Sequence, residues 1–165
     1  MRLVVDASTL VAEVLRVRGR ELLTHHALDL APAEETWGET EYELRKRVAL
    51  LAERGTFTPL HATQLLDEAL ATMAARVAPV SPDVYEKQME EARRRIPRDP
   101  RDAPVVALAL ALNCGIWTRD RDFFGCGVPV WITETLRVHL EARSSAAIHL
   151  RVHYSSSKAS FATRG

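Results

Sequence analysis

The chain has 165 residues and a mass of 18.5 kDa, which suits a single domain and leaves no room for two of ordinary size. Apolar residues make up 47% of it and charged residues 27%, a balance that excludes a largely disordered protein. The longest apolar stretch, residues 103–112, is too short to cross a bilayer, and Asp6 precedes any signal-peptide core. We therefore expect a cytoplasmic protein without membrane contact, in which two reduced cysteines are too few for a disulfide framework or a zinc site.

Positive and negative charges balance over the whole chain, at 22 bases and 22 acids, so net charge does not indicate a nucleic-acid partner. Their distribution is uneven. Residues 143–165 hold four bases and no acid, or +4, which leaves 18 bases against 22 acids, or −4, for residues 1–142. We expect a main domain over residues 1–142 and a mobile, basic, Ser/Ala-rich tail over residues 143–165. An acidic domain of this kind binds a polyanion only through local arginines or bound cations.

Short apolar runs and longer amphipathic runs alternate in the first third of the chain. In chain order they predict a strand over residues 3–5, helices over 9–17 and 20–26, a strand over 28–30 and a helix over 33–54. Asp6 follows the first strand, and Ser8 is placed to cap the helix after it. Gly19 is expected to separate the two short helices, because glycine destabilises helix interiors.

The rest of the chain continues this alternation. In chain order it predicts a helix over residues 59–77 capped by Thr58, an extended segment over 78–80, a helix opened by Pro82, a helix over 103–112, strands over 115–118 and 128–132, and a helix over 133–142. The helix over residues 103–112 is apolar all round, which indicates burial on most sides. Strands that alternate with helices predict an α/β fold, a three-layer α/β/α sandwich with a short central parallel sheet.

Four carboxylates lie where this fold would bring them together. Asp6 and Asp120 come just after apolar strands. Asp102 begins the buried helix, and Glu39 lies in the early turns of the long helix. Because ligands bind at the carboxyl ends of parallel strands, we expect the four to meet at one edge of the sheet. Carboxylates held together recruit a cation, and hard oxygen ligands with no nearby Cys or His favour Mg²⁺ or Mn²⁺ over zinc.

Each of these acids also has an ordinary structural explanation. Asp6 and Asp102 could each cap the helix that follows. Asp120 could be a solvated loop acid, and Glu39 shares its helix with other glutamates of the surface. The joint placement of the four, rather than any single one, favours a functional site.

Three segments of the sequence carry a family resemblance. They are residues 3–8 (LVVDAS), 102–112 (DAPVVALALAL) and 116–123 (IWTRDRDF). Together they resemble the PIN-domain ribonucleases, especially the small bacterial and archaeal members, many of which are VapC-type toxins. The last segment is similar to that family's Thr-x-Asp-x-Asp-Phe pattern, and the resemblance spans roughly residues 2–141.

The resemblance implies a PIN-like fold and a metal-dependent endoribonuclease that hydrolyses RNA phosphodiester bonds with Mg²⁺ or Mn²⁺. It assigns the catalytic and metal-binding roles to Asp6, Glu39, Asp102 and Asp120, with Asp122 as a further metal ligand. Ser8 and Thr118 match hydroxyl positions that hold these acids in place. Glu43, one helical turn after Glu39 on the same face, is the second candidate for the helix acid.

The resemblance also implies partners. It points to the toxin of a toxin–antitoxin pair, with RNA as substrate, a small antitoxin protein and a homodimer. Arg119, Arg121 and the run at residues 93–95 are candidates to guide the RNA backbone. For residues 93–95 the alternative is pairing with the surface acids Glu90 and Glu91.

Other functions compete with the nuclease. A haloacid-dehalogenase-type phosphatase needs a second Asp where Ser8 stands, and a response-regulator receiver needs an acidic pair where Asp6 stands alone. A PIN fold that keeps its acids but serves as a non-catalytic RNA-binding or partner-binding module is the stronger alternative. Trp117 and Trp131 could stack on a base, but their apolar strand patterns favour the core.

Overall fold

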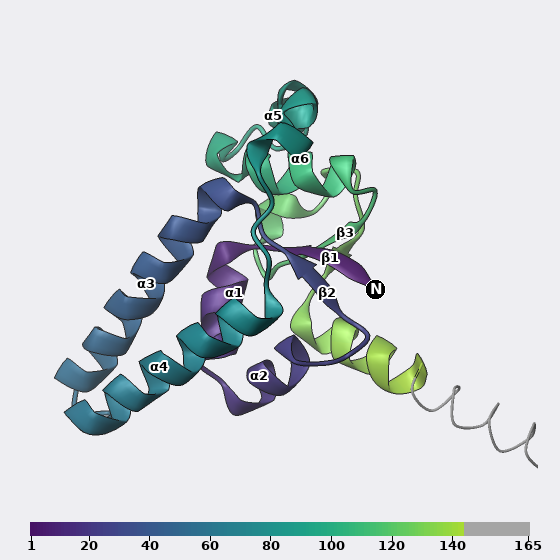
Figure 1. Cartoon of the computed structure of the whole chain (residues 1–165). Coiled ribbons are helices and arrows are strands. Elements are labelled where there is room, and N and C mark those ends of the chain that lie inside the picture. The colour runs from purple at the N-terminus through teal and green to yellow at the C-terminus, as the bar shows by residue number, and fades with distance from the viewer. Residues whose placement is uncertain (144–165) are drawn as a thin grey trace, which may run out of the picture. The chain divides into compact units, whose positions relative to one another are not determined.

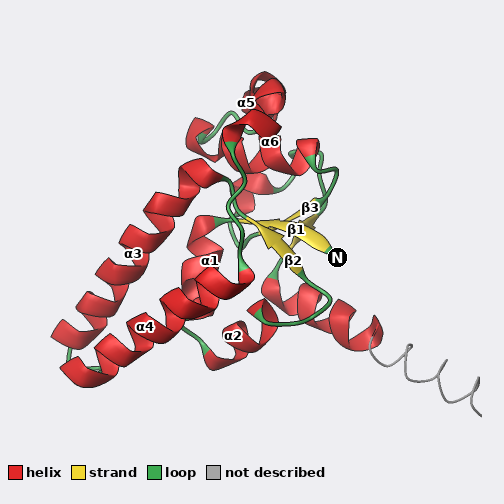
Figure 2. Ribbon diagram, in the orientation of Figure 1, coloured by secondary structure: helices red, strands yellow, loops and turns green. Residues whose placement is uncertain are grey.

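The computed structural model describes residues 1–143 and contains one short parallel sheet with helices on both sides (Figures 1 and 2). Its strands are β1 (Arg2–Val5), β2 (Asp29–Ala31), β3 (Gly115–Trp117) and β4 (Val130–Trp131). They are all parallel, in the order β2-β1-β3-β4. The predicted α/β/α sandwich with a short central parallel sheet is confirmed.

The helices alternate with these strands. They are α1 (Ala7–Val14), α2 (Val17–Leu23), α3 (Glu34–Glu53), α4 (Pro59–Arg76), α5 (Met89–Arg95) and α6 (Ala103–Ala111). Single 3₁₀ turns are η1 (Pro82–Val84), η2 (Glu86–Gln88), η3 (Pro100–Asp102) and η4 (Arg121–Phe123). A second unit begins at Thr133, and of it the structure describes residues 133–143, which are helical. The predicted basic tail, apart from Arg143, lies outside the described residues.

The core is built around β1 and α6. Leu3, Val4 and Val5 are all buried, as is usual for a parallel strand covered on both faces. Residues 103–109 of α6 are likewise buried, which confirms the prediction from their apolar character, and α6 packs against β1 and β3. Figure 2 shows α5 and α6 on one side of the sheet and α1 and α2 on the other. Each fully buried Leu or Val contributes roughly 1.5–3 kcal/mol, so this arrangement fixes the position of both strand ends.

Two predictions about the first helices are wrong. α1 begins at Ala7, so Ser8 lies in its first turn rather than at its N-cap. Gly19 lies inside α2 instead of separating two helices. A Cβ atom at Gly19 would stand 2.1 Å from the carbonyl oxygen of Glu13, so glycine is needed there because the start of α2 crosses the end of α1 closely.

The chain after α4 differs from the prediction in detail. Thr58 caps α4 as expected, by accepting a hydrogen bond from the His61 amide at 3.3 Å. The segment predicted as extended, residues 78–80, lies beside β2, where two isolated parallel bridges, Leu30–Val77 and Ala33–Val80, hold it without forming a longer strand. No helix within residues 1–143 combines the length and apolar character needed to span a membrane.

Candidate functional site

The carboxyl ends of β1 and β3 bring Asp6 and Thr118 together. The Asp6 amide donates to the Trp117 carbonyl at 3.1 Å, which continues the pairing of the two strands by one residue. Asp6 is only 7% exposed, and its Oδ2 accepts hydrogen bonds from Ser8 Oγ at 2.5 Å and Thr118 Oγ1 at 3.2 Å. Although Asp6 occupies the N-cap position of α1, its side chain makes no capping hydrogen bond. Helix capping therefore does not explain this acid.

One hydroxyl links Asp6 to the next candidate acid. Thr118 Oγ1, which donates to Asp6, also accepts a hydrogen bond from the Asp120 amide at 3.0 Å. Asp120 itself is exposed, and its Oδ1 accepts from the Asp122 amide at 2.9 Å, which caps η4. The Thr118 hydroxyl is therefore both a donor and an acceptor, and it connects the residues that follow β1 and β3 in the way that its predicted supporting role requires.

Asp102 lies against the other carboxylates. It stands at the N-cap position of α6 without a side-chain capping bond, whereas Asp99 caps η3 by accepting from the Arg101 amide at 3.0 Å. The pKa of Asp102 is raised to about 6, chiefly by burial and then by the negative charges of Asp6, Asp99 and Asp120. The structure thus brings Asp6, Asp102 and Asp120 into one electrostatic neighbourhood, as the sequence predicts.

Glu39 reaches the same neighbourhood from α3. The pKa of Arg101 is raised, first by its hydrogen bond with Asp99 and then by negative charges that include Glu39 and Asp102. The charges of Glu39 and of Asp102 at the start of α6 therefore both act on Arg101. The side chain of Glu39, the predicted fourth carboxylate, is exposed.

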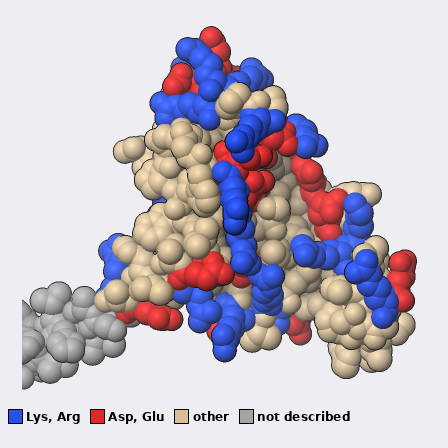
Figure 3. Space-filling model, turned by 180° about the vertical axis from the view of Figure 1, so that it is seen from behind, with Lys and Arg blue, Asp and Glu red and all other residues tan. Residues whose placement is uncertain are grey.

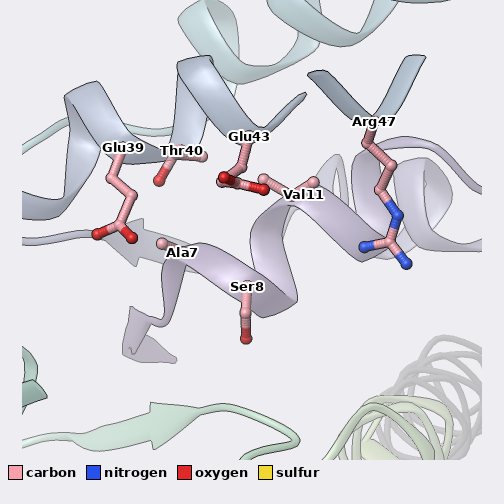
Figure 4. Close-up of a pocket in the computed structure, with 7 residues that line it drawn as sticks. All are labelled: Ala7, Ser8, Val11, Glu39, Thr40, Glu43 and Arg47. Atoms are coloured by element: carbon pink, nitrogen blue, oxygen red, sulfur yellow. The ribbon is translucent and has the colours of Figure 1, made fainter. Parts of the chain in front are cut away.

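A cavity of about 150 Å³ between α1 and α3 adjoins these residues (Figure 4). It is lined by Ala7, Ser8, Val11, Glu39, Thr40, Glu43 and Arg47. Figure 4 shows Glu39 of α3 and Ser8 of α1 on the two walls of this space. Glu43 forms an ion pair with Lys46 at 3.1 Å, whereas Glu39 makes no salt bridge with any described residue. Of the two candidate helix acids, Glu39 has the charge free to act on a ligand.

Other predicted residues lie further out. Asp122 forms an ion pair with Arg98 at 3.1 Å and does not contribute to the raised pKa of Asp102. Arg121 is exposed, and Arg119 is exposed while its amide donates to Thr9 Oγ1 at 3.1 Å. Asp122 therefore faces a cation rather than the other acids.

The alternative explanation is confirmed for two of the three arginines at residues 93–95 and for one of the two tryptophans. In the arginine run, Arg94 pairs with Glu90 at 3.0 Å and Arg95 with Glu91 at 2.7 Å, both within α5. Trp117 is fully buried, so it belongs to the core and cannot stack on a base.

On the face shown in Figure 3, acidic side chains gather into a patch bordered by basic ones.

The candidate side chains have the right chemistry to bind a hard divalent cation, but the described ones are not grouped closely enough to hold it. Among residues 1–143, no three Asp, Glu, His or Cys side chains stand close enough together to hold a metal ion. The candidate donors are nevertheless all carboxylates, the oxygen ligands that Mg²⁺ and Mn²⁺ prefer. Asp6, Asp102 and Asp120 would have to come closer together to share a cation, and a bound cation would offset the repulsion among their charges.

Sequence reasoning missed three residues of this site. Thr9 is buried, and its hydroxyl lies 3.5 Å from Asp6 Oδ2. Asp99 and Arg101 form an ion pair at 2.7 Å beside Asp102. The available signals were the hydroxyl pair Ser8-Thr9, which begins two residues after Asp6, and the repeated Pro-Arg-Asp of residues 97–102, which composition alone marks only as a turn.

Solved structures with the same fold include PAE2754 from Pyrobaculum aerophilum, at 23% identity and a TM-score of 0.61, over 86% of this chain and 96% of that one. FitAB bound to an IR36 DNA fragment matches at 22% identity and a TM-score of 0.49, over 80% and 94% of the two chains. FitAcB from Neisseria gonorrhoeae matches at 23% identity and a TM-score of 0.45, over 79% and 96%. No curated protein matches the chain.

A family model described as "PIN domain" matches residues 4–141. This span includes both strand ends and all four candidate carboxylates. PIN domains are generally nucleases and typically use divalent metal ions. Because the match extends over most of the sequence, the chain belongs to the PIN domain family.

Proposed function

We propose that this PIN domain is a metal-dependent endoribonuclease that hydrolyses RNA phosphodiester bonds. The observation that carries the proposal is the pKa of Asp102, which burial and the charges of Asp6, Asp99 and Asp120 raise to about 6. Carboxylates from separate segments that lie near one another repel, and Arg101 offsets only part of that repulsion at Asp102. Such an arrangement is typical of sites that bind or transform a ligand.

The proposed ligands of the cation are Asp6, Asp102 and Asp120, and Glu39 would complete a second site with the substrate phosphate. When bound, Mg²⁺ or Mn²⁺ supplies an activated water and neutralises charge on the phosphate. Asp122 would join the metal ligands only by leaving its ion pair with Arg98, so we place it last among them.

The side chains around the acids have supporting roles in this proposal. Ser8 and Thr118 restrict rotation of the Asp6 carboxylate through their hydrogen bonds to Oδ2. Arg119 and Arg121, both exposed, would attract the RNA backbone toward a site that otherwise repels phosphate. The acids and the arginines thus divide the tasks of holding the cation and the substrate.

Cleavage of a mixed pool of structured RNA tests the proposal. We expect cuts with Mg²⁺ or Mn²⁺, none with EDTA, and a loss of at least about 100-fold in Asp102→Asn. Asp83→Asn, which changes an exposed acid of η1, is the matched control and should cut like the wild type. Cleavage that persists in EDTA would contradict the metal-dependent mechanism. RNA binding without cleavage, unchanged in Asp102→Asn, would instead establish the non-catalytic binding module.

We also infer, from what the family resemblance implies, that the chain acts as the toxin of a toxin–antitoxin pair and forms a homodimer. Induced expression should then arrest bacterial growth, Asp102→Asn should not, and co-expression of a small antitoxin should restore growth. Sedimentation velocity tests the dimer, and a monomer at every concentration would contradict it. Growth arrest equal for wild type and Asp102→Asn would argue against a nuclease toxin.

A further inference from the structure

A surface hollow lies directly beyond the Asp120 end of the candidate site. Its walls include the side chains of Arg95, Arg98, Arg121, Asp122 and Phe124. Asp122 connects it to the site, because the Asp122 amide donates to Asp120 Oδ1 at 2.9 Å. The hollow and the candidate site therefore share this short segment of the chain.

The charge of the hollow is opposite to that of the carboxylate site. Three arginines against one carboxylate give its lining a formal charge of +2. Arg121 is exposed and forms no ion pair with any described residue, so a ligand can use it without breaking an existing contact. A phosphate that the carboxylates would repel is attracted here.

The fold holds part of this lining in place. Arg95 donates to Glu91 at 2.7 Å and to the Cys126 carbonyl at 3.3 Å. Gly127 has a φ of +83°, which favours glycine, and a Cβ atom there would stand 2.7 Å from Arg95 Nη1 and displace that guanidinium group. Arg98 forms an exposed ion pair with Asp122 at 3.1 Å. Of the three guanidinium groups, that of Arg95 is therefore held most firmly before a ligand arrives.

Phe124 gives the hollow an exposed aromatic ring. It follows η4 directly, its amide donates to the Arg121 carbonyl at 3.0 Å, and its side chain is 53% exposed. The preceding Phe123 is fully buried and satisfies the core. An exposed phenylalanine among arginines offers a stacking surface for an unpaired base, which is how proteins commonly bind single-stranded RNA.

We propose that this hollow binds one unpaired nucleotide of a single-stranded RNA next to the cleaved phosphate, with its base on Phe124 and its phosphate at Arg121 and Arg98. This inference rests on the proposed nuclease function and adds to it the place where substrate is gripped. It implies that the chain prefers RNA that is single-stranded at this position, because a paired base cannot reach the ring.

Binding of a labelled single-stranded RNA, followed by fluorescence anisotropy, tests the proposal. The assay uses the full-length Asp102→Asn protein, in which we expect no turnover and in which the hollow is unchanged. We expect Phe124→Ala to weaken binding about tenfold and Phe124→Trp to preserve it. Leu60→Ala, which removes an exposed apolar side chain from α4, is the matched control and should have no effect.

Two further measurements separate stacking from charge. Each nucleotide of the RNA is replaced in turn by an abasic one. At one position this should weaken RNA binding about tenfold in the protein that keeps Phe124, and should not change RNA binding in Phe124→Ala. Arg121→Gln should reduce the slope of log affinity against log salt by about 1, whereas Arg54→Gln, at the exposed end of α3, should not. Equal affinities for Phe124→Ala and Leu60→Ala, or no such abasic position, would overturn the proposal.

The outcomes also distinguish this inference from the nuclease itself. Metal-dependent cleavage together with unchanged RNA affinity in Phe124→Ala removes the hollow as a subsite and leaves the nuclease standing. Weakened binding in Phe124→Ala, in a chain that cuts no RNA, supports the hollow and contradicts the nuclease.

Discussion

Asp6 and Asp102 belong to the same candidate site but are held in different ways. Asp6 is buried at the end of β1 and accepts hydrogen bonds from Ser8 and Thr118. Asp102 is partly exposed at the start of α6 and accepts no hydrogen bond from any described residue. The β1 side is therefore ordered by hydrogen bonds, whereas on the α6 side burial and neighbouring negative charges raise the pKa of a carboxylate that has no such bonds.

This difference explains why one carboxylate of the site is already oriented while another is not. Buried hydrogen bonds give the Asp6 carboxylate a single orientation. The Asp102 carboxylate is partly buried near the charges of Asp6 and Asp120, and a bound cation would offset that repulsion. The account therefore predicts that changes on the ordered side lower the stability of the fold, whereas a change at Asp102 alters stability in a pH-dependent way.

Removing the hydroxyl at Thr118 should break the ordered side. Thr118→Val leaves the Asp6 carboxylate with one hydrogen bond fewer and the Asp120 amide without its acceptor. We expect the free energy of unfolding to fall by about 1–3 kcal/mol and RNA cleavage to fall about 10- to 100-fold. Urea unfolding and initial cleavage rates measure the two effects.

Thr118→Ser keeps the hydroxyl and should restore most of both properties. Thr63→Val, which removes an exposed hydroxyl bonded within α4, is the matched control and should change stability by less than about 0.5 kcal/mol. If Val and Ser at position 118 behave alike, the shared hydroxyl does not order the site.

A smaller effect should distinguish the two glutamates of α3. Glu39 has no salt bridge among the described residues, whereas Glu43 is paired with Lys46. We expect Glu39→Gln to lower kcat about tenfold and Glu43→Gln to leave it nearly unchanged. The reverse order would assign the role of helix acid to Glu43.

The smallest effect concerns the stability of the metal-free protein. The pKa of Asp102 in the folded state, about 6, exceeds its ordinary value of 3.8, so the folded protein binds this proton more tightly than the unfolded chain does. Ionised Asp102 therefore lowers stability as pH rises from about 4 to 6, and the full cost persists above that range. In EDTA at neutral pH, Asp102→Asn should be more stable by on the order of 1 kcal/mol, a figure already reduced for solvent screening.

Thermal unfolding across this pH range measures the effect. The advantage of Asp102→Asn should disappear below about pH 4, where the wild-type carboxyl is protonated in both states. Asp83→Asn should show no such dependence. A wild type that is more stable than Asp102→Asn at neutral pH without metal would show that Asp102 is compensated rather than repelled.

The parts of the site that follow from contiguous patterns could be predicted from the sequence. An apolar run that ends in Asp6 marks a strand end, and the apolar stretch after Asp102 marks a buried helix. The cap at Thr58 followed by Pro59 is equally local. These features depend on neighbours in the chain, so the sequence carries them directly.

The remaining features depend on packing between distant segments. Gly19 was expected to break a helix, but it lies inside α2, where the close approach of the Glu13 backbone leaves no room for a side chain. The joint action of Glu39 and Asp102 on Arg101 requires α3 and α6 to be positioned first. The exposure of Phe124 beside a buried Phe123 likewise follows from the turn at η4 and not from the two identical letters.

The central claim is that carboxylates from β1, β3 and α6 converge on a divalent cation. Titration of the full-length protein with Mn²⁺, followed by electron paramagnetic resonance of the free ion, tests it most directly. The account predicts stoichiometric binding in the wild type and in Asp83→Asn, and loss of binding in Asp6→Asn and Asp102→Asn. No binding in the wild type, or binding that survives both of the latter substitutions, would contradict it.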